Sequence, residues 1–287
     1  MVGTNVIVTG SAGYIGRHVC HELRRVGWTP IPVDIADPLM PVDVLDTAGL
    51  RAWVDGLQPV GVIHLAAHSD VTESMSAPAK YAENGAMVQS LLAVVGHMPA
   101  VLASSAAIYG KARGLAVRED AAIYPANPYG ESKWHSESLM YDAMRLRFFN
   151  VAGGPRGRPK HLIPQVVDAL MNGREITVYG DGTAVRDFVH VEDAARAAVL
   201  ALEARLKGIP GQPVNICSGR PVRVSAVINR AAELLGVTPR VNYQPARAGE
   251  PEYLVGLATK AKNLLRWKAT TDLDGIIRSA AGLDAVA

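Results

Sequence analysis

Short apolar runs and helical stretches alternate along the chain up to Asn150. The apolar runs are rich in Val and Ile and carry no alternating polar positions, which is typical of strands buried on both faces. We expect strands at Val6–Val8, Pro30–Val33, Val60–Leu65, Ala100–Ser104 and Leu146–Phe149. We expect the helices between them at Gly13–Val26, Thr47–Leu57, Pro78–Gly96 and Pro128–Met144. This alternation predicts an α/β fold with a doubly wound parallel sheet, the Rossmann arrangement.

The rhythm changes after Asn150. Gly153 to Pro159 is rich in Gly and Pro and predicts a loop. Beyond it we expect strands at Ile176–Tyr179 and Val214–Cys217 and helices at Leu162–Met171, Val224–Leu235 and Asp274–Ala281. The pattern predicts one domain over residues 1–152, to which part of 183–200 returns, and a smaller C-terminal α/β domain over 153–287.

Composition and charge narrow the function classes. Apolar residues make up 49% and charged residues 20%, as in ordinary soluble globular proteins. The net charge is +2 and no basic cluster is present, so we expect no nucleic-acid partner. No apolar run reaches the roughly 18 residues of a membrane span, and no leader pattern precedes Asn5–Val8. Cys20 and Cys217 form no paired or metal-binding pattern. We expect a cytoplasmic protein with buried free thiols and no metal.

A glycine-rich segment joins the first strand to the first helix. In Thr9–Gly16 the glycines follow a GxxGxxG spacing. Gly10 permits a tight turn, Gly13 lets a pyrophosphate approach the backbone, and Gly16 lets the helix pack on the strand. The helix N-terminus presents N–H groups and a positive dipole end to phosphates. Because a strand precedes the segment and a helix follows it, the segment predicts a dinucleotide site.

An aspartate at the end of the second strand indicates which dinucleotide binds. Asp34 can accept hydrogen bonds from the ribose hydroxyls of NAD and would repel the 2′-phosphate of NADP. Arg17 is the one residue that argues for NADP. Asp43 and Val44 could hold the adenine edge, although Asp43 could equally form an Asx turn before the next helix. We therefore expect NAD as the cofactor.

A tyrosine and a lysine share one face of the fourth predicted helix. Tyr129 and Lys133 lie one turn apart, so the ammonium group favours the phenolate and lowers the pKa of the tyrosine. A tyrosine of this kind can take a proton from a sugar hydroxyl. Ser105 ends the fourth strand, and ligands of open α/β sheets bind at the carboxyl ends of the strands. Ser105 is therefore expected to bond the same substrate oxygen.

With these motifs in view, the chain resembles the extended short-chain dehydrogenase/reductases. Within them it is most similar to the NAD-dependent epimerase/dehydratase family and its UDP-galactose (UDP-glucose) 4-epimerase-like members. The similarity runs nearly end to end, through TGSAGYIGRHV, HLAAHSDVTESMSAPAKYAENG, SSAAIYG, YGESK, RFFNVAG, the segment from His161 to Ala195, and RAGEPE with ATKAKNLLRW. The chain departs from the family pattern at Ser69 and His161.

The resemblance implies roles for individual residues. It makes Ser105, Tyr129 and Lys133 catalytic. Around the cofactor it places Gly10, Gly13, Tyr14, Ile15, Gly16, Asp34, Asp43, Val44, Leu65, Ala66, Ala67, Ser69, Asn84, Tyr129 and Lys133. At the nucleotide-sugar it places Ser105, Asn150, Leu162, Arg186, Arg247 and Glu250. The chemistry agrees, because the two arginines offer fork-shaped donors to a diphosphate.

The residues after Ser105 bear on the reaction. Family dehydratases carry an Asp-Glu pair there, whereas this chain has Ala106 and Ala107, which cannot move protons. The sequence therefore favours a UDP-sugar 4-epimerase, which oxidises C4 to a keto sugar and returns hydride to the other face. A dehydratase or reductase of the same family, and a non-catalytic NAD-binding regulator, remain alternatives. The base and the sugar stay open.

Family members commonly form dimers through two helices. The matching helices here are Pro78–Gly96 and Pro128–Met144. The resemblance thus implies a homodimer joined by a four-helix bundle.

Overall fold

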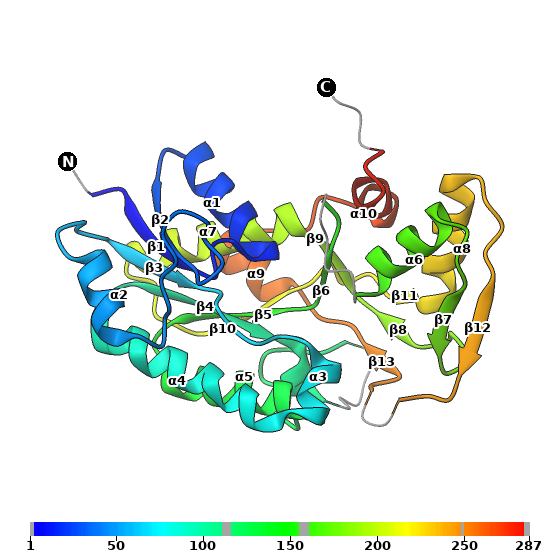
Figure 1. Ribbon diagram of the computed structural model, residues 1–287, viewed down its shortest axis with the longest axis horizontal. Coiled ribbons are helices and arrows are strands. Elements are labelled where there is room, and N and C mark those ends of the chain that lie inside the picture. The colour runs from blue at the N-terminus through cyan, green and yellow to red at the C-terminus, as the bar shows by residue number, and fades with distance from the viewer. Residues whose placement is uncertain (1–2, 111–115, 155–160, 248–249, 284–287) are drawn as a thin grey trace.

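A parallel six-stranded sheet forms the larger part of the protein (Figure 1). The computed structural model describes residues 3–110, 116–154, 161–247 and 250–283. The strand order is β2-β1-β3-β4-β5-β10. The strands are β1 (Asn5–Thr9), β2 (Thr29–Val33), β3 (Gly61–His64), β4 (Ala100–Ser105), β5 (Met144–Phe148) and β10 (Pro213–Ile216). The predicted doubly wound α/β fold is confirmed.

Helices cover both faces of this sheet (Figure 1). One face carries α1 (Tyr14–Arg25), α7 (Val191–Leu206) and α9 (Thr259–Leu265). The other carries α2 (Thr47–Val54), α4 (Pro78–Val95) and α5 (Pro128–Leu139). Successive residues of β1 point to opposite faces, so Val6 and Val8 join the core under α1 and α7 while Ile7 joins the core under α4. Burial on both faces explains why these strands read as continuous apolar runs.

The smaller part lies at the other end of the long axis (Figure 1). Its helices α6 (Leu162–Met171), α8 (Val224–Leu235) and α10 (Leu273–Ala280) pack around a separate apolar core. Its strands are β7 (Ile176–Tyr179) with β12 (Val241–Gln244), and β8 (Val185–Arg186) with β11 (Val222–Arg223) and β13 (Tyr253–Leu254). Between the two parts, β6 (Asn150–Ala152) pairs with β9 (Phe188–His190). Short helices follow β3 and β4, namely α3 (Val71–Ser76) and the 3₁₀ helix η1 (Ala106–Tyr109).

The structure differs from the expected division of the chain at two elements. Strand β10 and helix α9 fall within residues 153–287, which were expected to form the smaller domain, but both lie on the large sheet. Helix α7 overlaps the segment 183–200, part of which was expected to return to the first domain, and it packs on the large sheet. In β10, Val214 and Ile216 are fully buried beside β5. A short apolar run does not show which sheet it joins, so its partner strand decided the placement.

The helix that carries Tyr129 is shorter than expected. Helix α5 ends at Leu139, whereas the sequence predicted a helix to Met144. Met144 instead begins β5, pairs with Val101 and is fully buried. Buried residues on both sides of the turn, Met140 and Ala143, made the segment read as one continuous apolar helix face.

Candidate active site at the carboxyl ends of the strands

The glycine segment forms a tight loop between β1 and α1. Gly10 has a φ of +69°, which side chains rarely adopt, and a Cβ on it would lie 2.7 Å from the Ala66 nitrogen. A Cβ on Gly16 would overlap the Gly10 carbonyl oxygen, so the helix packs directly on the loop. Gly13 occupies the N-cap position and offers no side chain there. The N–H groups at this end of α1 are therefore not covered by a side chain of Gly13, as a pyrophosphate site requires.

The Asp34 carboxylate lies against this loop. The Ala12 N–H donates to Asp34 Oδ2 at 2.9 Å, and the Ala36 N–H donates to Oδ1 at 2.8 Å. The carboxylate is half-buried and remains able to accept ribose hydroxyls. Arg17, which argued for NADP, places its guanidinium carbon 5.5 Å from the centre of the Tyr14 ring. These residues fit NAD.

Asp43 forms a local turn. Its Oδ1 accepts the Leu45 N–H at 2.8 Å, which is the Asx turn that the sequence offered as the alternative. The neighbouring Val44 is buried and belongs to the core under α4. The adenine role of both residues stays a prediction.

The segment after β3 runs past the glycine loop toward α3. The N–H groups of Leu65 and Ala66 donate to Thr9 Oγ1 at 3.1 and 3.2 Å. Buried Asn84 accepts the His68 N–H at 2.8 Å and donates to the His68 carbonyl at 3.0 Å and to Ser132 Oγ at 2.9 Å. Asn84 therefore clamps this segment, which includes Ala67 and Ser69, to the helix that carries Tyr129.

The structure gathers Ser105, Tyr129 and Lys133 at the carboxyl end of β4. The Lys133 ammonium is buried and donates to the Ala103 carbonyl at 2.9 Å. Ser105 ends the same strand, and its Oγ accepts the Ala107 N–H at 3.2 Å. A Cβ on Gly130, next to Tyr129, would lie 2.8 Å from the Ala107 carbonyl oxygen, so α5 is pressed against η1. The structure therefore places these three residues around the end of one strand.

Sequence analysis missed Tyr81, which borders on Tyr129. The two rings meet edge to face with their centres 6.3 Å apart, and Tyr81 is fully buried in α4. The Tyr81 hydroxyl donates to the Asp70 carbonyl and to Glu73 Oε2. Its ring therefore forms a fixed wall beside Tyr129. No local spacing signals this contact, because Tyr81 and Tyr129 belong to different helices.

Sequence analysis also missed His64, which is buried at the end of β3. Burial, and to a lesser extent the Lys133 charge, lowers the pKa of His64 to about 3. Thr9 Oγ1 lies 2.7 Å from His64 Nδ1 and already accepts two backbone N–H groups. Its own proton therefore points to Nδ1, which assigns the neutral imidazole with the proton on Nε2.

The neutral state of His64 should make folding sensitive to acid. The unfolded chain binds a proton near pH 6.5 that the folded protein binds only near pH 3, so stability is lost as the pH falls between them. The free energy of unfolding should drop by up to about 1.4 kcal/mol per pH unit for this residue. Urea unfolding at pH 7 and pH 5 measures the drop in the wild type and in His64→Asn. An equal drop in both proteins would contradict the assignment.

A second polar cluster forms in the smaller part. Arg186 Nη1 donates to the Pro251 carbonyl at 2.7 Å, and its Nη2 lies 3.6 Å from Glu250 Oε2. Arg247 Nη1 lies 3.5 Å from Glu250 Oε1. Burial lowers the pKa of Arg186, but a guanidinium stays charged, so this cation is partly desolvated and favours an anionic ligand. The structure thus brings together three residues that the sequence predicted for the nucleotide-sugar.

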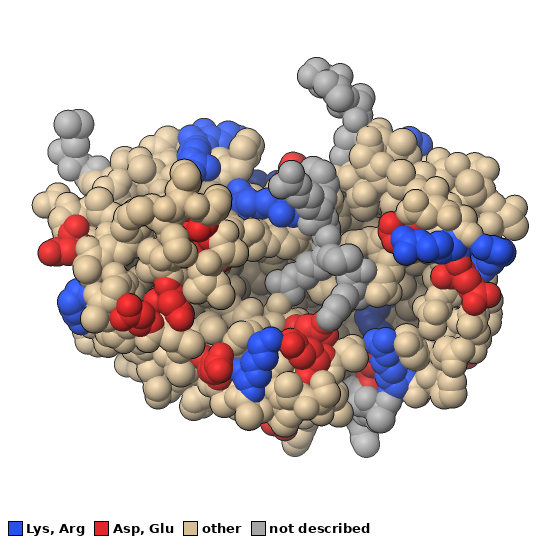
Figure 2. Space-filling view, viewed as in Figure 1, with Lys and Arg blue, Asp and Glu red and all other residues tan. Residues whose placement is uncertain are grey.

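Two residues that the sequence did not single out complete this cluster. The Arg247 guanidinium lies 3.6 Å from the centre of the Tyr179 ring. Arg247 Nη1 also lies 3.5 Å from Thr72 Oγ1, on the short helix α3 after β3. The cluster therefore reaches from the smaller part to the large sheet. The face drawn in Figure 2 is hollowed between the two ends of the molecule, and basic and acidic residues are interspersed over it.

Asn150 is bonded to the residue that follows Arg186, whereas Leu162 lies at the start of α6. The backbone N–H and Nδ2 of Asn150 both donate to the Asp187 carbonyl at 3.0 Å. Leu162 opens α6 and packs half-buried on the smaller core. Asp187, fully buried, is a further residue that sequence analysis missed.

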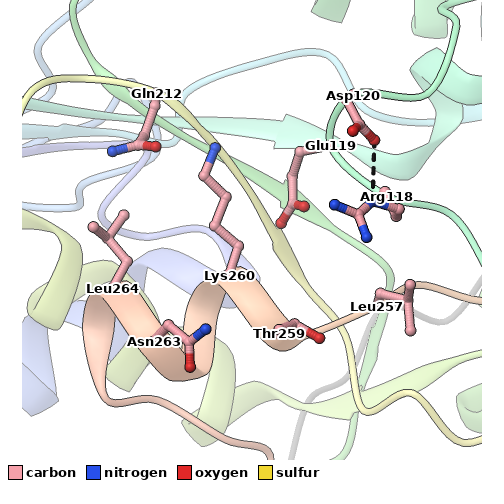
Figure 3. Close-up of a pocket in the computed structure, with 9 residues that line it drawn as sticks. All are labelled: Arg118, Glu119, Asp120, Gln212, Leu257, Thr259, Lys260, Asn263 and Leu264. Atoms are coloured by element: carbon pink, nitrogen blue, oxygen red, sulfur yellow. Dashed lines mark hydrogen bonds and ion pairs between the residues drawn. The ribbon is translucent and has the colours of Figure 1, made fainter.

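A cavity of about 530 Å³ lies elsewhere, beside β10 (Figure 3). Figure 3 shows Lys260 of α9 extending between Gln212 and Glu119. Gln212 precedes β10, so the cavity borders on the amino end of that strand rather than the carboxyl end, where ligands of such sheets bind. None of the predicted site residues lines it.

Comparison with known proteins agrees with this geometry. Residues 6–217 match the NAD dependent epimerase/dehydratase family. The chain belongs to this family. The resemblance inferred from the sequence motifs is therefore confirmed. Among the described residues, no helix is both long and apolar enough to cross a membrane.

Relatives of known activity match over nearly the whole chain. The UDP-glucose 4-epimerase of Azospirillum brasilense is 34% identical over 96% of this chain and 90% of its own length. The structure of the Brucella ovis UDP-glucose 4-epimerase in complex with NAD matches with a TM-score of 0.92 at 32% identity, over 98% of both chains. That of the Bifidobacterium longum UDP-glucose 4-epimerase in complex with NAD⁺ and UDP matches with a TM-score of 0.89 at 28% identity, over 98% of both.

Proposed function

We propose that the protein is an NAD-dependent UDP-sugar 4-epimerase. The observation that carries the proposal is the cluster of Ser105, Tyr129 and Lys133 at the end of β4, followed by two alanines. The relatives named above, two of them solved with NAD or with NAD⁺ and UDP, support the same activity.

The loop after β1 and the Asp34 carboxylate would hold the cofactor. Gly10, Gly13 and Gly16 leave room for the pyrophosphate, and Asp34 accepts the adenosine ribose hydroxyls. When bound, NAD supplies the acceptor and donor of the C4 hydride. The segment after β3, which Asn84 clamps, would form the wall behind the nicotinamide half.

Tyr129 is the proton-transfer group in this proposal. It takes the proton of the C4 hydroxyl and returns it, and the Lys133 ammonium stabilises the phenolate between the two steps. Ser105 donates to the same sugar oxygen. Ala106 is buried and neither it nor Ala107 carries an acid or base, which the elimination of water would require. The absence of such a group from these two positions favours epimerisation over dehydration.

The nucleotide, rather than the sugar, should supply most of the binding energy. The sugar must turn over between the two hydride transfers, so strong contacts to it would oppose the reaction. Arg186 and Arg247 would bind the diphosphate, Glu250 the uridine ribose, and Asn150 and Leu162 the neighbouring groups. With the nucleotide held by these residues, the sugar would be free to face the end of β4.

Removal of the Asp34 carboxylate should weaken NAD more than NADP. In Asp34→Ala the ribose hydroxyls lose a charged acceptor, worth roughly 1.5–3 kcal/mol, while the repulsion of a 2′-phosphate disappears. Calorimetric titration with each dinucleotide measures the change. A wild type that binds NADP as tightly as NAD would contradict this role of Asp34 and turn attention to Arg17.

The reaction itself is tested by incubating the purified protein with a panel of UDP-sugars. We expect interconversion of C4 epimers, with UDP-glucose and UDP-galactose, their N-acetyl forms and their uronic acid forms as the first substrates. Chromatography and NMR identify the products. A 4-keto-6-deoxy product without a C4 epimer would make the protein a dehydratase. Bound NAD without turnover of any UDP-sugar would favour the non-catalytic regulator.

We further propose a homodimer joined through α4 and α5, and a cytoplasmic location. The two helices pack side by side. Helix α5 exposes Trp134, an aromatic side chain of the kind that is enriched at interfaces. Helix α4 exposes the small residues Ala79, Ala82 and Ala86, which would let the helices of a second copy approach closely. Cys20 and Cys217 are both buried and free, which suits a reducing compartment.

A further inference from the structure

A buried carboxylate stands between the two parts of the molecule. Asp187 lies between β8 and β9 and is 0% exposed. Its Oδ1 accepts the Ser218 N–H and the Ser218 hydroxyl, each at 2.7 Å. Its Oδ2 accepts the N–H groups of Gly219 at 2.9 Å and of Gly256 at 3.3 Å. All four donors converge on one side chain, which the mechanism above does not use.

These bonds join segments from both parts. Ser218 and Gly219 follow β10, the edge strand of the large sheet, whereas Gly256 follows β13 of the smaller part. The two segments pack tightly there, because a Cβ on Gly256 would lie only 2.6 Å from Cys217 Sγ. A shift of the Asp187 side chain would therefore move the backbone of both segments.

The same residue is attached to the substrate cluster through its backbone. Its carbonyl accepts both the N–H and the Nδ2 of Asn150 at 3.0 Å. Its chain neighbour Arg186 donates to the Pro251 carbonyl, five positions before Gly256. Asp187 thus lies at the point where Asn150, Arg186 and the segment that follows Glu250 are tied together.

We propose that Asp187 is a positioning residue for the nucleotide-sugar. Its carboxylate, held by the four donors, sets where Arg186 and Asn150 stand, so its loss weakens binding of the UDP moiety rather than proton transfer. The inference rests on the proposed function. It adds a residue that never touches the ligand but decides the geometry of those that do.

The negative charge and the acceptor-only character of Asp187 both matter. Burial raises the pKa of this carboxyl, and the donors oppose the rise. An asparagine of the same size has one acceptor oxygen and one NH₂ group. The NH₂ group would point at backbone N–H groups, so that a donor would face a donor. In Asp187→Asn the segments must therefore move apart to relieve this clash.

The test compares Asp187→Asn with Asp193→Asn. Asp193 is equally buried and accepts the Thr270 N–H, the Thr270 hydroxyl and the Thr271 N–H, but it ties α7 to the segment after α9, away from the cluster. We expect Asp187→Asn to raise the Kd for UDP and the KM for the UDP-sugar by roughly tenfold to a hundredfold, with kcat within a few-fold and bound NAD unchanged. Asp193→Asn should lower the unfolding temperature while leaving Kd and KM at wild-type values.

A milder variant covers the case in which Asp187→Asn does not fold. Ser218→Ala removes one of the four donors and should raise the Kd for UDP in the same direction by a smaller factor. Unchanged UDP affinity in a folded Asp187→Asn or in Ser218→Ala, or equal changes in both Asp variants, would overturn the inference. Wild-type protein that does not bind UDP would instead overturn the proposed function, and the inference with it.

Discussion

Replacement of Tyr129 by phenylalanine should remove most turnover and leave binding intact. The substitution deletes only the hydroxyl that moves the proton, while the ring keeps its edge-to-face packing on Tyr81. General acid–base catalysis contributes roughly 10²–10⁴-fold, so kcat should fall by that order. Steady-state kinetics on the best UDP-sugar measures kcat, and calorimetry with UDP measures binding.

Tyr141→Phe provides the matched control. Tyr141 is 71% exposed in the turn after the same helix. Its variant should behave as the wild type in both assays. If Tyr129→Phe retained activity within a few-fold of the wild type, another residue would have to be the base.

Replacement of Glu137 by glutamine should destabilise the fold strongly. Glu137 lies on α5, one turn beyond Lys133, and accepts two hydrogen bonds from Arg147 of β5, at 2.9 and 2.8 Å. The side chains of both residues are almost completely buried. Arg147 also donates to the Tyr109 hydroxyl and the Glu119 carbonyl, so it cannot turn toward water. Without the Glu137 charge, the buried Arg147 guanidinium has no charged partner. The free energy of unfolding should therefore fall by about 3–5 kcal/mol.

Chemical denaturation measures this loss, with Asp120→Asn as the control. Asp120 pairs with Arg118 at 3.3 Å, and both side chains are largely exposed, so its variant should unfold close to the wild type. Similar unfolding of wild type and Glu137→Gln would mean that water or a new partner satisfies Arg147. Because Glu137 anchors the helix that carries Tyr129 and Lys133, Glu137→Gln should also lower activity as the temperature rises.

Local chemistry allowed much of the site to be predicted from the sequence alone. Gly10 and Gly16 lie where the neighbouring backbone leaves no room for a side chain. The sequence indicates this through the regular spacing of its glycines. Tyr129 and Lys133 lie four positions apart, so helical periodicity puts them on one face of α5. Ser105 ends a strand that was predicted from its apolar run. Such features depend on neighbours within a few positions, so one segment of sequence contains them whole.

Only the tertiary structure decided the features that join distant segments. The placement of β10 in the large sheet depended on the partner strand β5, because an apolar run fits any buried sheet. Three contacts of this kind connect residues far apart in the chain. They are the packing of Arg247 on the Tyr179 ring, the packing of Tyr81 beside Tyr129, and the four hydrogen bonds to the Asp187 carboxylate. No periodicity records these contacts, since packing and hydrogen bonding select the partner only after the elements have come together.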